Sequence, residues 1–404
     1  MRTLKDAYFK TFILLLVGLC LSGAAAISQT PPAQGEFWQS RDVVIEPDAK
    51  ASPVRIGIWD SGVDTSLFKG RLAVDRKGKV ISRGYDEFKL RKDTELAVLP
   101  PEILARLAEL NSVFTAYDDM DSGVENDNTR AWNKRLKEMN PEEKSSFNKA
   151  TDRWGGYTHG TVVADIAVAG NGRAEIVIAR MEWWHGSPPV PCWTKALADR
   201  EADSIRDLIR FLARSGSRVV NMSWGRFERS YVGNLEKCAP EMKAEDRLKL
   251  ARYTVDGIRK VLMKEMAAAP RVLFVGAAGN EGKTMADANP ATRFSLPNFI
   301  LVGAVDQKGK KTSFTNVGPE VTLYANGERV PARMPGGDLS YPSGTSMATP
   351  NVTNAAAKIL SINPALTGAE MRRLLEQTAD SNETGQKLLH SAKAVEAARA
   401  AAKR

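Results

Sequence analysis

The stretch VRIGIWDSGVD, residues 54–64, joins a run of apolar residues to a polar turn. Its first part, 54–59, is apolar at almost every position, and several similar runs follow along the chain. Near-continuous runs of Val, Ile and Leu are typical of strands that are buried on both faces of a parallel sheet. The later runs are AEIVIARMEW (174–183), SRVVNMSW (217–224), RVLFVGAA (271–278), NFILVGAV (298–305) and EVTLYA (320–325).

Helical patterns separate these runs. Ile205, Leu208, Ile209 and Leu212 follow the i, i+3, i+4, i+7 spacing of a helix that lies on a sheet. Alternating strands and helices predict an α/β fold of three layers, with a mostly parallel central sheet and helices on both faces. We expect one such domain over residues 54–404.

Residues 89–150 interrupt the alternation. They are charged, carry no buried-strand pattern and predict a helical insertion on the surface of the domain. The acidic stretch DDMDSGVENDN lacks the residue order of an EF-hand calcium loop, so we expect a solvated face there. No cofactor is predicted to be required, and structural calcium stays open without a clear motif.

The N-terminus predicts export. Residues 1–26 combine a basic head with an apolar run, 12–21, that is too short to span a bilayer, and Ala24 and Ala26 fit a signal-peptide cleavage site. The mature protein is expected to have no membrane anchor, to be secreted or periplasmic, and to begin with an extended arm over 27–53. The basic residues of the head are Arg2, Lys5 and Lys10.

The charge and cysteine content of the chain narrow the range of functions that the sequence allows. The formal net charge is +9, but Lys and Arg are spread among acidic residues, and no basic run alternates with aromatic residues. This pattern argues against nucleic-acid binding. Two cysteines, Cys192 and Cys238, remain after the predicted cleavage. In an oxidising compartment they could form a disulfide, and free thiols are the equal alternative.

Three polar residues stand where functional groups gather in α/β sheets, at the carboxyl ends of strands, and a fourth stands at a predicted helix start. Asp60 follows the run 54–59, Asn280 ends the run that starts at Arg271, and Ser346 opens a helix after the loop SYPSGT. His159, in YTHGTVVADIAVAG, is predicted to lie where an apolar helix starts. Taken alone, an Asp at the end of a strand or a Ser before a helix is usually a cap of that element. Together, Ser, His and Asp can supply a nucleophile, its base and the group that orients the base.

The surrounding segments resemble those of subtilisin-like serine proteases, the subtilase family. Four of them match the family's motifs in the family's order, and further strand segments match as well. The likeness runs from about Val54 to the last helix, apart from the insertion. The four segments are GIWDSGVD (57–64), HGTVVADIA (159–167), GAAGNEG (276–282) and SGTSMATPNV (343–352).

The resemblance implies a serine endopeptidase that acts on proteins or peptides through an acyl-enzyme. By motif, Ser346 would be the nucleophile, His159 the general base, Asp60 the group that orients the imidazole, and Asn280 the side-chain donor of the oxyanion hole. Pro350 is expected in the first turn of the helix of Ser346, where a missing N–H costs little.

The resemblance also implies a substrate-binding strand at Ser223, Trp224 and Gly225. Trp224 stands where smaller apolar residues are common in the family. Glu281 would lie near the same pocket and favour basic side chains.

The chain departs from the family pattern in four respects. The separation of Asp60 and His159 is long because of the insertion, and Val162 and Asn351 each stand in place of a histidine that is common in the family. In addition, no long pro-domain is expected before the domain. The alternative function is a catalytically silent subtilase scaffold that binds a partner. The sequence does not indicate which oligomeric state the protein has.

Overall fold

The computed structural model describes residues 35–47, 50–121, 125–182 and 191–402. The predicted leader, 1–26, lies outside these residues. The described part of the predicted arm contains a short helix, α1 (Glu36–Gln39), and places Trp38 and Ile45 in the apolar core. The arm is also tied to the domain by an ion pair between Asp42 and the fully buried Lys358, at 2.8 Å. Among the described residues, no helix is long and apolar enough to cross a membrane.

The centre of the fold is a mostly parallel sheet, as the apolar runs predict. In the described residues the strand order is β10-β11-β7-β6-β5-β4-β1-β3-β2, and the pair β10–β11 is antiparallel. The strands that form it are β1 (Val54–Asp60), β2 (Ser82–Tyr85), β3 (Ala174–Met181), β4 (Ser217–Met222), β5 (Leu273–Ala277), β6 (Phe299–Val305), β7 (Val321–Asn326), β10 (Asp380–Ser381) and β11 (Lys387–Leu388). A small hairpin, β8 (Ala332–Arg333) with β9 (Leu339–Ser340), lies outside the sheet.

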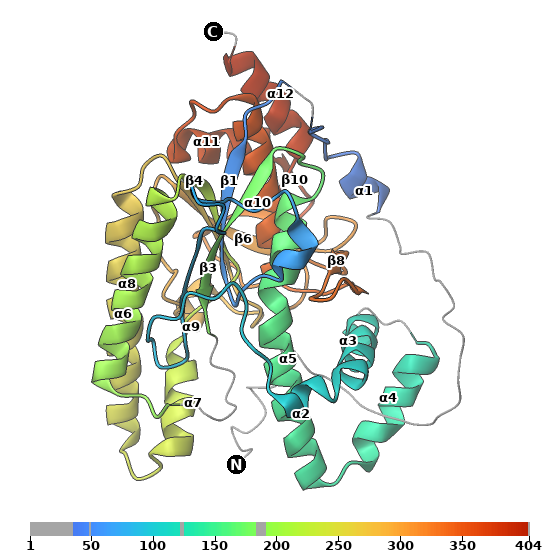
Figure 1. The fold of residues 1–404 in the computed structure, drawn as a ribbon, viewed down its shortest axis with the longest axis vertical. Coiled ribbons are helices and arrows are strands. Elements are labelled where there is room, and N and C mark those ends of the chain that lie inside the picture. Colours follow the sequence, from blue (N-terminus) through green and yellow to red (C-terminus); the bar gives the residue numbers. More distant parts are fainter. Residues whose placement is uncertain (1–34, 48–49, 122–124, 183–190, 403–404) are drawn as a thin grey trace.

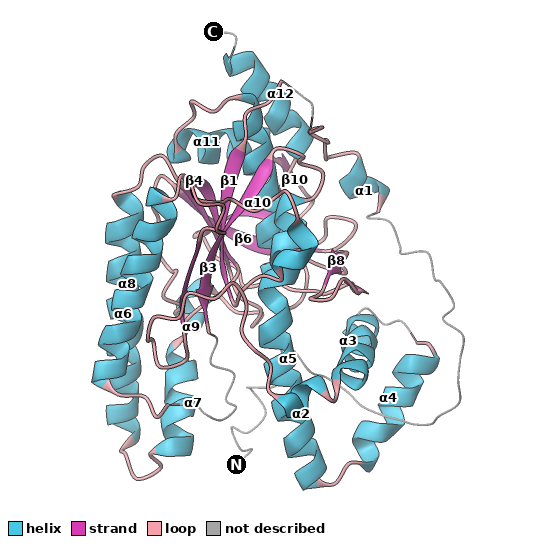
Figure 2. Ribbon diagram, in the orientation of Figure 1, coloured by secondary structure: helices cyan, strands magenta, loops and turns pink. Residues whose placement is uncertain are grey.

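Helices cover both faces of the sheet, which makes three layers (Figure 1; Figure 2). On one face α6 contacts β2, β3 and β4, and α8 and α7 pack beside it. On the other face α10 contacts β1 and β4 to β7, and α5 packs against α10. The predicted α/β architecture is therefore confirmed. The helices are α5 (Pro141–Val168), α6 (Lys195–Arg214), α7 (Glu228–Cys238), α8 (Ala244–Ala267), α9 (Met285–Ala288), α10 (Thr345–Ile362), α11 (Gly368–Thr378) and α12 (Ser391–Ala402).

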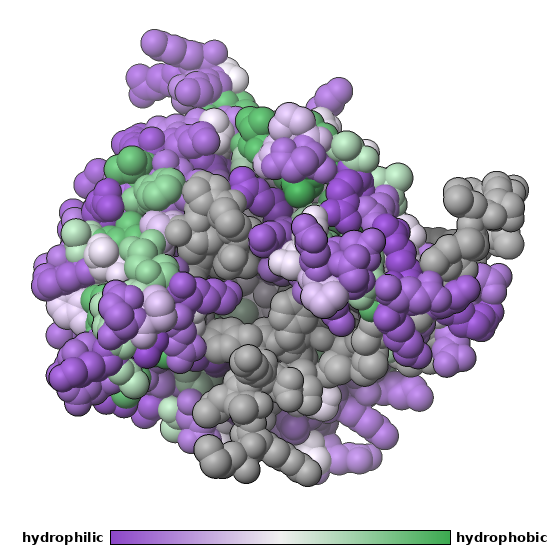
Figure 3. Space-filling model, turned by 90° about the horizontal axis from the view of Figure 1, so that it is seen from below, coloured by the Kyte–Doolittle hydropathy of each residue, from purple (hydrophilic) through white to green (hydrophobic). Residues whose placement is uncertain are grey.

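The insertion is helical, and it has a small core of its own. It comprises α2 (Pro101–Leu104), α3 (Leu107–Asp121), α4 (Asp127–Glu138) and the first part of α5. Apolar side chains of α3, α4 and α5 form a separate cluster around Val113, Tyr117, Trp132, Leu136 and Phe147. Seen from below in Figure 3, hydrophilic side chains cover most of the coloured surface at this end of the molecule. The insertion thus combines a solvated outer face with a packed inner one.

The start of α5 differs from the sequence prediction. His159 was expected near the beginning of a helix, but α5 begins at Pro141, so His159 lies in its interior. The cause is local: the side chain of Asn140 accepts the backbone N–H groups of Glu142 and Glu143, and the carboxylate of Glu143 accepts the backbone N–H of Asn140. This capping box, with Pro141 in the first turn, is a strong helix start. The inserted segment therefore runs without a break into the helix that carries His159.

Candidate active site

Asp60 and His159 are in direct contact. Asp60 ends β1, its side chain is fully buried, and its Oδ1 lies 2.8 Å from Nδ1 of His159. The same oxygen accepts the backbone N–H of Ser61 at 2.7 Å, which fixes the carboxylate. A carboxylate bonded to Nδ1 selects the tautomer in which Nδ1 carries the proton, so Nε2 is left as a base.

The turn after β1 is held tightly against α5. The Oγ of Ser61 accepts the backbone N–H of Gly160, and a Cβ at Gly160 would lie 2.2 Å from the carbonyl oxygen of Gly62. Only glycine allows this approach. The glycine that follows His159 thus lets the imidazole reach the end of β1.

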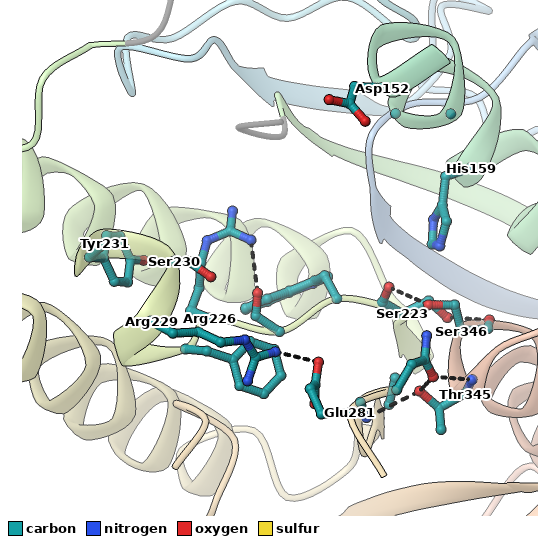
Figure 4. Close-up of a pocket in the computed structure, with 18 of the residues that line it drawn as sticks. Asp152, His159, Ser223, Arg226, Arg229, Ser230, Tyr231, Glu281, Thr345 and Ser346 are labelled. Carbon is teal, nitrogen blue, oxygen red and sulfur yellow. Dashed lines mark hydrogen bonds and ion pairs between the residues drawn. The ribbon is translucent and has the colours of Figure 1, made fainter. Parts of the chain in front are cut away.

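Ser346 is the second residue of α10, at the helix end where backbone N–H groups are unpaired. Gly344, just before the helix, has φ 150° and lies beside Asn280, whose Nδ2 would be 3.2 Å from a Cβ at this position. Ser346 and His159 line one pocket (Figure 4), and in this structure the Oγ of Ser346 donates to the carbonyl of Ser223 at 3.2 Å.

Pro350 lies deeper in α10 than the sequence suggested. Because α10 begins at Thr345, Pro350 is its sixth residue and falls inside the helix, so the first-turn expectation is wrong. A proline there removes the N–H that would bond the carbonyl of Ser346. The Oγ of Ser223 donates to that carbonyl at 2.8 Å and replaces the missing bond. Ser223 is thereby coupled to the backbone of the predicted nucleophile.

Asn280 is oriented by Thr345. Its Oδ1 accepts the backbone N–H of Thr345 at 2.8 Å and the hydroxyl of Thr345 at 2.7 Å. With the oxygen fixed in this way, the Nδ2 donors are directed toward the pocket that Ser346 lines. An amide held in this way has N–H groups of the kind that an oxyanion hole uses.

The pocket has a volume of about 410 Å³ and extends from Ser346 to the opposite helices. Ser223, Trp224 and Gly225 form part of its wall, as the family resemblance implies. Trp224 is almost fully buried and packs edge-to-face on Trp59, with ring centroids 4.8 Å apart. Its indole thus forms a wall and is not free in the opening.

The charged groups in the pocket are mostly paired. Glu281, which the sequence suggested as a partner for basic substrate side chains, forms an ion pair with Arg229 and accepts a hydrogen bond from Asn316. Its charge is therefore already compensated within the protein. Deeper in the wall, Glu201 pairs with Arg226 at 2.8 Å and lies 3.7 Å from Lys89. Arg226, Arg229 and Lys89 were not singled out in the sequence, because their partners are distant along the chain.

A disulfide flanks the same region. Cys192 and Cys238 are bonded, with their Cα atoms 5.6 Å apart. The bond joins the end of α7 to the segment that carries Trp193, which lines the pocket and donates through its indole to the hydroxyl of Thr254. The disulfide therefore anchors one border of the pocket.

We expect that replacing both cysteines by serine lowers the free energy of unfolding by about 2–4 kcal/mol, because closing a loop restricts the unfolded chain. Chemical denaturation of the Cys192→Ser/Cys238→Ser protein measures the change. The wild type treated with a reducing agent is the matched control, and it should lose a similar amount. Equal stability of all three samples would mean that the thiols are free in solution.

The described residues contain no group of three or more His, Cys, Asp or Glu side chains arranged to hold a metal ion. The sequence did not single out two further lining residues, Tyr117 of the insertion and Asp152, which follows the insertion on α5. Asp152 precedes His159 by seven residues, which is two helical turns. The sequence alone gives this spacing, but it places the two residues on the same face of a helix only because α5 is continuous from Pro141 to Val168.

Comparisons with known proteins agree with this geometry. The sequence model of the Subtilase family matches residues 51–393. Subtilisin NAT of Bacillus subtilis subsp. natto is 39% identical over 115 residues, which is 28% of this chain and 30% of the relative. The thermostable alkaline protease of Halalkalibacterium halodurans is 41% identical over 108 residues, 27% of this chain and 29% of the relative. The match thus spans less than a third of these relatives.

Solved structures share the fold over a larger part of the chain. A structure of subtilase cytotoxin assembly has a TM-score of 0.55 and 15% identity, and the match covers 91% of this chain and 97% of that one. The A-subunit of the AB5 toxin from E. coli has a TM-score of 0.54 and 16% identity, with 90% and 99% covered. At these identities the likeness concerns the fold. The family model, in contrast, matches most of the sequence, and this chain therefore belongs to the subtilase family.

Proposed function

We propose that this subtilase is an exported serine endopeptidase that hydrolyses peptide bonds in proteins or peptides. The observation that carries the proposal is the convergence of the Asp60–His159 pair, Ser346 and the oriented amide of Asn280 on one pocket. A protein that only binds a partner needs no such convergence.

In the proposed reaction the Oγ of Ser346 attacks the carbonyl carbon of the scissile bond, and its proton passes to Nε2 of His159. The carboxylate of Asp60 stabilises the resulting imidazolium. The carbonyl oxygen becomes an oxyanion, which accepts hydrogen bonds from Nδ2 of Asn280 and from the backbone N–H of Ser346. When the intermediate collapses, the C–N bond breaks and His159 returns the proton to the leaving amine. Water then hydrolyses the acyl-enzyme by the same steps, with His159 as base.

Labelling by a fluorophosphonate probe tests the proposal. The probe attaches covalently to an activated serine, so the folded protein should be labelled on Ser346. A folded protein that is not labelled would favour the alternative, a silent scaffold that binds a partner. Export has its own test: the mature protein recovered outside the cytoplasm should begin at Ile27, after the predicted cleavage site.

Replacing Asn280 by alanine should lower kcat by about 10²–10³-fold with little change in KM, because an oxyanion donor acts in the transition state. Steady-state kinetics on a peptide substrate measures both constants. Asn280→Asp is the matched variant: it keeps an oxygen for the two hydrogen bonds from Thr345 but loses the donor, and it should be at least as impaired. Normal kcat in Asn280→Asp would show that Nδ2 has no role in catalysis.

A further inference from the structure

The insertion forms one wall of the pocket that contains Ser346. Asp152, Gly155, Gly156 and His159 of α5 line the pocket. Phe114 and Tyr117 of α3 line it beside them. Figure 4 shows the carboxylate of Asp152 directed from α5 into the open space, across from Arg226 and Ser230. The insertion is therefore part of the space that a substrate would enter.

The lining residues of α5 share one face of the helix. Asp152 and His159 are seven residues apart, which places them on the same side and about 10 Å apart along the axis, at 1.5 Å per residue. Gly155 and Gly156 fall between them and leave that stretch of the face without side chains. A Cβ at Gly155 would lie 3.2 Å from the ring of Phe114. Glycine in a helix interior costs about 0.5–1 kcal/mol relative to alanine. The open groove between the carboxylate and the imidazole is kept in spite of that cost.

Asp152 differs from the other carboxylates of the pocket. Glu201 and Glu281 both form ion pairs with arginines. Within the part of the chain that the structure describes, Asp152 forms no hydrogen bond and no ion pair. The hydroxyl of Tyr117 is buried and likewise has no hydrogen-bond partner among the described residues. Burial raises the pKa of Tyr117, and the nearby charge of Asp152 raises it further. An unpaired carboxylate and an unsatisfied hydroxyl thus lie near each other on the same wall.

The opposite wall of the pocket carries cations, which would favour an acidic side chain of the substrate. Arg226 and Lys89 share a single carboxylate, that of Glu201. Both side chains are covered, however, with 14% and 4% of their surface exposed. Arg226 also donates to the carbonyl of Gly225 at 3.2 Å. The charge that is both unpaired and accessible is therefore the negative one on Asp152.

We propose that the insertion and the part of α5 that follows it build a subsite for a basic side chain of the substrate, with Asp152 as the anion and Phe114 as an apolar wall. The inference rests on the proposed peptidase function and adds a preference for substrates that carry Arg or Lys. Residues of an extended chain advance by about 3.3 Å, so the basic residue lies within about three residues of the scissile bond.

The electrostatics give the subsite a dependence on pH. Burial raises the pKa of Asp152 to about 6, while the positive charge of Lys237 on α7 acts in the opposite direction. Tyr117 on α3 is the other titratable group that interacts with Asp152. Because Asp152 becomes neutral as the pH falls through that value, the preference for a basic residue should weaken between pH 7 and pH 5. Arg226, Arg229 and Lys89 lie across the pocket, and Arg226 and Lys89 both interact with the carboxylate of Glu201.

The test compares peptides that differ at one position near the scissile bond. Arginine is compared with citrulline, which has nearly the same shape without the charge, and with glutamate. Wild-type protein should cleave one of the arginine peptides with a kcat/KM about tenfold above that of its citrulline partner. Asp152→Asn, a nearly isosteric change, should reduce that ratio to about one.

Asp127→Asn is the matched control, since Asp127 belongs to the insertion but is fully exposed on α4 and is paired with Arg130. It should keep the wild-type ratio. A ratio that persists in Asp152→Asn would overturn the inference, and a preference for the glutamate peptide would overturn it in favour of Arg226 and Lys89. Fluorophosphonate labelling separates the two proposals. Labelled protein without an arginine preference contradicts the subsite alone, whereas protein that is folded but not labelled contradicts the peptidase function as well.

Discussion

Replacing Ser346 by alanine is expected to abolish peptide hydrolysis, with a loss of about 10⁶-fold in kcat, because the acyl-enzyme cannot form without the hydroxyl. Fluorophosphonate labelling should disappear with it. The stability should change little, since among the described residues this hydroxyl has one hydrogen bond, to the carbonyl of Ser223, and such a bond contributes about 1 kcal/mol. Thermal unfolding and a turnover assay on the same sample measure both.

A second serine on the same helix provides the control. Ser361 lies near the end of α10, and its hydroxyl donates to the carbonyl of Ala357 within the helix. Ser361→Ala should therefore remain active and labelled. If Ser346→Ala still hydrolysed peptide at the wild-type rate, the nucleophile would be another residue, and the proposed mechanism would be wrong.

The central fold could be predicted from the sequence because its strands are buried on both faces. The run 298–305 became β6, Phe299–Val305, and the other apolar runs from Val54 onward became strands at nearly the predicted bounds. The short strands β2, β10 and β11, which lie at or next to the edges of the sheet, were not predicted. They are only partly buried and too short to show a pattern, so their pairing depends on neighbours that are distant in sequence.

The proposed catalytic groups could be found from the sequence for a different reason. Each stands in a short motif, and the fold brings the end of β1, the middle of α5 and the start of α10 together. The pairing of charges in the pocket could not be predicted from the sequence. Whether Glu281 can bind a basic side chain of the substrate depends on whether a cation of the protein is already paired with it. That cation is Arg229, which is 52 residues away along the chain. Only tertiary structure shows that Glu281 is paired and that Asp152 is not.

Replacing Asp60 by asparagine should lower kcat by about 10⁴-fold while the pocket keeps its shape. Asp60 accepts both the Nδ1 proton of His159 and the backbone N–H of Ser61 through one oxygen, so an amide of the same size fits the site but no longer holds an anion there. Without the anion the imidazolium loses its stabilisation, and the tautomer with a basic Nε2 is no longer favoured.

Asp64→Asn, four residues further along the same turn, separates this effect from a general loosening of the turn. The carboxylate of Asp64 caps a short 3₁₀ helix (Thr65–Phe68) by accepting from Ser66, and it also accepts the backbone N–H of Gly336. Asparagine is as good a cap as aspartate, but its amide nitrogen replaces the oxygen that accepts the N–H of Gly336. The loss of that hydrogen bond costs about 1 kcal/mol of stability, so Asp64→Asn should unfold at a lower temperature and keep its kcat. Asp60→Asn should show the reverse, with a small change in unfolding temperature and a large fall in kcat. Parallel losses of stability and kcat in both variants would mean that Asp60 acts only through the fold of the turn, and that His159 needs no anion to work as a base.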